Sequence, residues 1–155
     1  MRLAITLFIS VCFLFSQHAN ARLGETKTQL DARFGPCIRT LPADRGEEML
    51  QYRLKNLMVL VTLVHGKSEM EIYAPQDART PFRQSETQSL LEDNSFGKRW
   101  RSITNIPAWF LGSSPDPRSW IAVATYFPKS AQMIAPSLTI MTADYARRRG
   151  LMPKI

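Results

Sequence analysis

The feature that most constrains the fold is a stretch in which apolar residues recur at every second position between short polar turns. Residues 50–54 and 69–74 carry this pattern, residues 57–64 between them form a continuous apolar run, and the three segments are rich in β-branched, aliphatic and aromatic side chains. Lys55-Asn56 and His65-Gly66-Lys67 separate them and have the length and residue types of tight hairpin turns. The pattern therefore predicts a three-stranded antiparallel meander.

A short helix is predicted before these strands. Thr26 followed by Gln29 is typical of a capping box at a helix start, and Gly35-Pro36 is typical of a helix end. Leu30 and Phe34 fall on one side of this helix. A helix of so few turns needs a sheet beneath it to be stable.

The second half of the chain repeats this order of elements. Ser85 with Gln88 reads as another capping box, leading into a helix that ends near residues 94–97. The tail from Asp144 onward fits either a last helical turn or a frayed end. Strand character follows the second helix at residues 99–104, 108–111, 120–127 and 137–142.

These patterns predict an α+β fold in which short helices pack on an antiparallel β-sheet. Glu25-Thr26 with Phe34-Gly35 recurs as Glu86-Thr87 with Phe96-Gly97, and each helix is followed by about three strands. The alternative is a chance likeness between two capped short helices. The two tandem units would span residues 22–80 and 81–145.

Residues 1–21 have the organisation of a cleaved export signal. Arg2 precedes the apolar run of residues 3–15, and Ala19-Asn20-Ala21 supplies small residues before a cleavage site. A membrane anchor would need about 20 apolar residues, and a lipoprotein signal would make Cys12 the acylated residue. We expect a periplasmic or secreted protein with one domain over residues 22–155.

The scarcity of cysteine and histidine narrows the chemistry. The chain has two of each, and Cys12 and His18 leave with the export signal, so Cys37 and His65 remain. An intrachain disulfide and a His/Cys zinc site are therefore not expected, and we predict no metal or cofactor. The formal net charge of +7 fits a soluble surface or contact with an anionic envelope surface.

The opening segment resembles known families of small exported proteins. Gly24-Glu25-Thr26 with Leu30 and Gly35-Pro36 is similar to the start of domains built like β-lactamase inhibitor protein and like the SmpA/OmlA lipoproteins. The longer pattern Arg22-Leu23-Gly24-Glu25-Thr26 with Arg33-Phe34-Gly35 looks like the start of uncharacterised secreted bacterial proteins. The resemblance implies short helices on an antiparallel sheet and a role in binding other proteins. We transfer no functional residue from the lipoproteins, because two features differ. Their pattern is Gly-x-Pro where Gly35 and Pro36 are adjacent here, and they have an anchoring cysteine at the position where we expect Arg22.

An enzymatic interpretation has two candidate sites. Cys37 with His65 as its base would form a nucleophilic pair, and Glu69 with Glu71, two positions apart on a strand, would share a face. Both sets also suit ordinary turn and surface positions. A small hydrolase centred on Cys37 or on these carboxylates is the first alternative function.

Aromatic and basic residues in the second half form the candidate partner-binding face. Nucleic acid is not expected, because export removes most such partners and no nucleic-acid motif occurs.

Residues 57–64 and 120–127 are apolar on both faces, which predicts either cover by the helices or an interface. We expect an exported, non-catalytic module that binds another protein or a second copy of itself, or assembles in the envelope. A basic protein that binds anionic surfaces is the second alternative. The candidate face consists of Arg99, Trp100, Arg101, Trp109, Trp120 and Tyr126.

Overall fold

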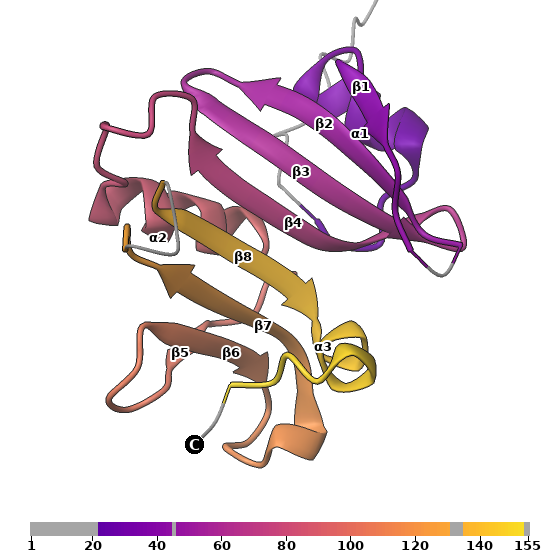
Figure 1. Ribbon diagram of the computed structural model, residues 1–155. Helices are drawn as coiled ribbons and strands as arrows, with labels where there is room; N and C mark the ends of the chain where they lie inside the picture. The colour runs from indigo at the N-terminus through magenta and orange to yellow at the C-terminus, as the bar shows by residue number, and fades with distance from the viewer. Residues whose placement is uncertain (1–21, 45, 131–134, 154–155) are drawn as a thin grey trace, which may run out of the picture.

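The computed structural model describes residues 22–44, 46–130 and 135–153 and contains three α-helices, eight strands and one 3-10 turn in these ranges (Figure 1). The predicted export signal, with Cys12, His18 and Ala21, lies outside the described residues. The elements are α1 (Lys27–Phe34), β1 (Arg39–Leu41), β2 (Glu48–Leu54), β3 (Leu57–Val64), β4 (Lys67–Pro75), α2 (Gln84–Asp93), β5 (Arg101–Ser102), β6 (Ala108–Gly112), η1 (Pro117–Ser119), β7 (Trp120–Phe127), β8 (Ser137–Thr142) and α3 (Ala143–Arg149).

All eight strands belong to one sheet, in the order β1-β2-β3-β4-β8-β7-β6-β5, and every neighbouring pair is antiparallel. The predicted α+β class is confirmed. The element order is a helix with four strands, then again a helix with four strands, whereas the sequence suggested about three strands each. β4 and β8, the last strand of each set, pair at the centre and join the two sets (Figure 1).

The meander β2-β3-β4 is confirmed, and its turns explain the register. Leu54 pairs with Leu57 and Val64 with Lys67, so each turn has two residues. Lys55 and His65 have φ values of 53° and 51°, the positive φ that tight hairpin turns require. His65, the single histidine among the residues that the structure describes, is therefore an exposed turn residue.

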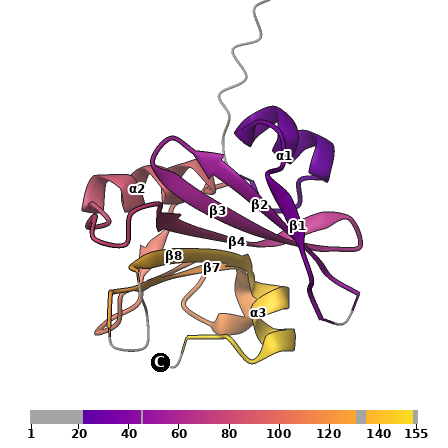
Figure 2. The ribbon, with the colours of Figure 1, turned by 45° about the horizontal axis from the view of Figure 1, so that its top comes forward.

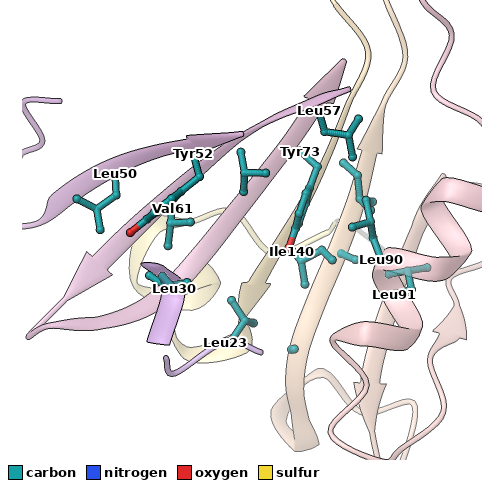
Figure 3. Close-up of a cluster of buried hydrophobic side chains, with 14 of the residues drawn as sticks. Leu23, Leu30, Leu50, Tyr52, Leu57, Val61, Tyr73, Leu90, Leu91 and Ile140 are labelled. Carbon is teal, nitrogen blue, oxygen red and sulfur yellow. The ribbon is translucent and has the colours of Figure 1, made fainter. Parts of the chain in front are cut away.

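The helices cover the two faces of the sheet unequally. α1 and α2 lie on one face and α3 on the other (Figure 2). Leu30 from α1 and Leu90 and Leu91 from α2 pack on Tyr73 and Ile140 from the sheet, forming the larger core (Figure 3). A smaller core lies under α3 and includes Val123, Met141, Tyr145 and Ala146.

Apolar residues on both faces of β3 reflect this cover. Leu57, Val59, Val61 and Leu63 are buried beneath the first two helices, whereas Met58 and Leu60 on the other face are half-buried. No helix in the described part of the chain is long and apolar enough to cross a membrane.

The start of α2 corrects one sequence prediction. The helix begins at Gln84, and the Glu86 carboxylate accepts a hydrogen bond from the Arg83 backbone N–H at 2.9 Å. Ser85 therefore lies inside the first turn and does not cap the helix. The capping box at α1 is confirmed, because Gln29 accepts a hydrogen bond from the Thr26 backbone N–H at 2.9 Å.

Candidate partner-binding groove

A groove of about 700 Å³ lies between α2 and the segment that leads into β5. α2 contributes residues at helical spacing, which form a continuous stripe along one wall. The opposite wall is the segment 97–100, and Trp109 of β6 also lines the groove. The lining residues are Gln84, Thr87, Gln88, Leu91, Glu92, Ser95, Gly97, Lys98, Arg99, Trp100 and Trp109.

The local sequence builds this groove through a tight reversal after α2. Phe96 and Gly97 have φ values of 51° and 71°, and the Lys98 backbone N–H donates to the Ser95 carbonyl oxygen at 2.8 Å. The chain then returns beside the helix that it has just left. The Trp100 indole N–H donates to the Leu91 carbonyl oxygen at 2.5 Å, which fixes the second wall to the helix.

The floor of the groove is aromatic. Trp100 and Trp109 are half-buried and pack against the larger core, on the same face of the sheet as α2. A half-buried tryptophan offers a large apolar surface with little loss of conformational freedom on binding. This floor is therefore suited to anchoring an apolar group of a partner.

The two walls carry different charges. Lys98 and Arg99 are exposed on one wall, and neither forms an ion pair within the described residues. Glu92 on α2 accepts a hydrogen bond from Gln88 at 3.1 Å. Arg101, the first residue of β5, also lacks a carboxylate partner in this part of the chain.

The structure brings together only part of the candidate face. Arg99, Trp100 and Trp109 line the groove, and Arg101 follows directly in β5. Trp120 lies in the opposite core, where it is 5% exposed and stacks on Phe110 with ring centroids 4.7 Å apart.

A register shift accounts for the position of Trp120. A regular strand would place Trp120 on the same face as Ala122, but the pairing of β6 with β7 shifts between Leu111 and Gly112, so the two side chains lie on opposite faces. Tyr126 remains on the groove face, 6.1 Å from the Phe82 ring, but is outside the groove lining.

Sequence reasoning missed the α2 wall. Gln84, Gln88 and Glu92 recur at intervals of four residues and are exposed, so their spacing places them on one helix face. That stripe was visible in the sequence, but nothing in it indicated that residues 97–100 would return alongside.

The Cys37–His65 pair predicted as an alternative site is not assembled. The Ile38 backbone N–H bonds to the Gln51 carbonyl oxygen, which places Cys37 beside the middle of β2. His65 lies in the turn that follows β3. That turn comes just after Leu63, which pairs with Glu48 at the start of β2, so His65 lies near the start of β2 and not near its middle. The Cys37 thiol instead donates to the Arg39 carbonyl oxygen at 3.3 Å.

Glu69 and Glu71 do not share a face. β3 and β4 shift register so that Thr62 pairs with Met70 and Leu63 with Ser68, which leaves Glu69 as the extra residue of a bulge. Glu69 accepts a hydrogen bond from Thr142 and pairs with Arg148 of α3 at 3.7 Å. Glu71 points into the larger core, so the carboxylate pair is ruled out as a common site.

Glu71 belongs to a buried charge cluster between α1 and the sheet. Arg33 contacts it at 2.6 Å and contacts Glu25 at 3.2 Å, and the Tyr73 hydroxyl donates to its second oxygen. Burial, followed by the Glu71 charge, raises the pKa of Tyr73 well above its ordinary value. Because one Glu71 oxygen contacts Arg33 and the other accepts the Tyr73 hydrogen bond, we interpret the cluster as a structural link between α1 and the sheet.

The arginine run of α3 is engaged within the molecule. Arg147 donates to the Pro117 carbonyl oxygen at 2.9 Å, and Arg149 pairs with Glu47 at 3.4 Å. The described residues contain no group of three His, Cys, Asp or Glu placed to hold a metal ion.

No family model matches the chain, and no curated protein matches it. Two solved structures are similar to it over most of its length. One is a cysteine-rich secretory protein from Staphylococcus aureus, with 14% identity over 80% of this chain and 46% of that chain, at a TM-score of 0.45. The other is an extracellular protein containing an SCP domain from Bacillus anthracis, with 13% identity over 83% of this chain and 46% of that chain, at a TM-score of 0.45. This chain thus spans under half the length of the structures that it matches.

Proposed function

We propose that this chain is an exported, non-catalytic protein-binding or envelope-assembly module whose partner occupies the groove beside α2. The single observation that carries the proposal is the groove itself, in which Trp100 and Trp109 form an apolar floor beside the unpaired cations Lys98 and Arg99. Tryptophan and arginine are the side chains most enriched at the energetic centres of protein interfaces.

A protein partner fits this groove better than the alternative functions. The candidate nucleophile, base and carboxylate pair lie apart, and none of Cys37, His65, Glu69 and Glu71 lines the groove. Arg148 and Arg149 of α3 face carboxylates of their own chain. Those arginines therefore add little to a surface for anionic polymers or lipid.

Export is the part of the proposal that rests on residues 1–21. Expression of the full chain in a bacterial host should deliver it outside the cytoplasm, with Arg22 as the first residue of the mature form. Mass spectrometry of the exported protein measures this. A cytoplasmic chain with an intact N-terminus would contradict export, and a mature chain that begins with an acylated Cys12 would contradict cleavage after Ala21.

Affinity capture from the exported fraction of the native cell tests the binding function. The bait is residues 22–155, compared with Gln88→Trp, which places a bulky ring in the groove from an exposed helix position. Thr28→Trp, an exposed position on α1, is the matched control. We expect a partner that the unmodified chain and Thr28→Trp retain and Gln88→Trp loses. Equal capture by all three baits, or no specific partner, would overturn the proposal.

A further inference from the structure

Resting on the proposed function, we infer that the partner contributes an extended segment that alternates apolar and acidic residues and adds as a strand to the open edge of β5. Three independent features carry this inference: the hydrogen-bonding pattern of β5, the side chains on its two faces, and the unpaired cations along it.

The first feature is the free backbone of β5. It is the last strand in the sheet order, at one end of the sheet (Figure 1), and among the described residues it pairs only with β6. The Ile103 backbone N–H donates to the Ala108 carbonyl oxygen at 2.8 Å, and the same register continues to Arg101 with Phe110. Because hydrogen-bonded pairs alternate along antiparallel strands, the N–H and C=O of Ser102 point away from β6.

An outward N–H and C=O on an exposed edge are a template for another strand. Both Arg101 and Ser102 are exposed, so the edge is accessible to an incoming chain. One incoming residue opposite Ser102 satisfies both backbone groups. Further residues of that segment then lie alongside Trp100 and the basic wall.

The second feature is the difference between the two faces of this edge. Ser102 pairs with Trp109 and therefore lies on the groove face, whereas Arg101 pairs with Phe110 and lies on the other face. Successive side chains of an added strand point to these two faces in turn. Apolar residues on the groove side would contact the tryptophan floor, and the residues between them would lie next to Arg101.

The third feature is charge. Lys98, Arg99 and Arg101 form a basic strip with no carboxylate partner in the described residues, whereas Arg33 contacts two carboxylates and Arg149 contacts one. Opposite charges on neighbouring strands stabilise pairing, and like charges oppose it. An acidic partner segment therefore fits the strip. Pairing of this edge with a second copy would instead bring its own arginines together.

Glu92 on the α2 wall makes that side of the groove unfavourable for acidic residues of the partner, because like charges repel. Glu92 lines the groove from α2, whereas Lys98 and Arg99 line it from the segment after the helix, and the Glu92 carboxylate accepts a hydrogen bond from Gln88. Acidic residues of the partner are thus favoured on the Arg101 side of the edge and at the basic wall. The groove side near α2 favours uncharged residues.

The probe that tests this inference is a capped octapeptide of alternating valine and glutamate, titrated into isotopically labelled residues 22–155 and followed by NMR. We expect shifts at Ser102 and at the indole N–H groups of Trp100 and Trp109, together with slower exchange of the Ser102 amide proton. Control peptides are alternating valine and lysine, a block of valines followed by glutamates, and the first peptide with N-methyl groups at alternate positions.

Two charge-reversal variants complete the design. Arg101→Glu should weaken binding of the valine–glutamate peptide about tenfold or more. Lys67→Glu makes the same change of net charge at an exposed hairpin residue and should leave binding unchanged. Absence of binding, equal binding of the lysine or block peptide, or unchanged affinity with Arg101→Glu or the N-methylated peptide would overturn the inference.

The outcomes separate this inference from the proposed function. A partner captured through the groove and lost with Gln88→Trp, while the octapeptide does not bind, would leave the function standing and overturn the edge strand. Peptide binding with Ser102 protection, but capture unaffected by Gln88→Trp, would overturn the groove and leave the edge strand. Self-association of residues 22–155 at β5 would overturn the acidic segment as occupant.

Discussion

Arg33 shows how one buried side chain holds several segments together. Its side chain is 5% exposed, and it contacts the fully buried Glu71 and the Glu25 of the preceding loop. Removal of one partner from a buried ion pair leaves the other as an uncompensated charge. The desolvation cost of that remaining charge makes single substitutions here more damaging than paired ones.

We therefore expect Arg33→Met to lower the free energy of unfolding by about 3–5 kcal/mol. The double variant Arg33→Met with Glu71→Gln removes both charges and keeps an acceptor for the Tyr73 hydroxyl, so it should be more stable than Arg33→Met alone. Urea unfolding of the three proteins measures both differences. A cost below about 1 kcal/mol for Arg33→Met would contradict a buried pair.

Tyr73 predicts a loss of stability in alkaline solution. Burial and the Glu71 charge raise the pKa of Tyr73 in the folded state, while in the unfolded chain it ionises near pH 10. Its contribution is therefore fully present below about pH 10 and is lost as the pH rises above that value, because only the unfolded chain releases the proton.

Tyr73→Phe, which does not ionise, should lose less stability over the same pH range than the unmodified chain. The measurement is urea unfolding at several alkaline pH values, with phenolate absorbance recorded in parallel. Reversible ionisation of Tyr73 while the protein remains folded would contradict the prediction.

At the scale of single elements, the first turn of α2 gives a direct test of the corrected helix start. Ser85→Ala should change the free energy of unfolding by less than about 0.5 kcal/mol, because Ser85 is an exposed residue inside the helix. Glu86→Ala removes the hydrogen bond to the Arg83 N–H and should cost about 1 kcal/mol. Thermal unfolding of both variants measures this, and the reverse order would restore Ser85 as the cap.

The elements that could be predicted are those whose signals are local. β3, β7 and β8 have the predicted bounds because a strand of β-branched and aromatic residues ends at a turn residue at each side. β1 was missed because Arg39–Leu41 is short and mostly polar, and only its pairing with β2 makes it a strand. Edge strands of this kind carry little sequence pattern of their own.

The candidate site was predictable to the same extent. Aromatic and basic residues are concentrated in this part of the sequence, and of these Trp100, Trp109 and Arg99 line the groove, whereas Trp120 lies in the smaller core. Its face depends on the register shift at Gly112, and Glu69 depends in the same way on the bulge in β4. A shift of one residue moves a side chain to the opposite face, and strand alternation alone does not reveal where that shift occurs.

At the scale of the whole molecule, the two helix-plus-four-strand sets share one sheet and the larger core. Met70 to Tyr73 of β4 pair with Leu138 to Met141 of β8, and Tyr73 packs with Leu90 and Ile140 from the second set. The first set therefore buries part of its apolar surface only against the second. This sharing makes the two sets interdependent, whether or not they arose by duplication.

We accordingly expect residues 22–155 to unfold in one cooperative transition, with calorimetric and van't Hoff enthalpies that agree. Residues 22–80 alone should not fold, because β4 would become an open edge and the larger core would lose Leu90, Leu91 and Ile140. Scanning calorimetry of the longer chain and the amide NMR spectrum of the shorter one measure this. Two separate transitions, or a dispersed spectrum from residues 22–80, would instead make the first set an independent domain.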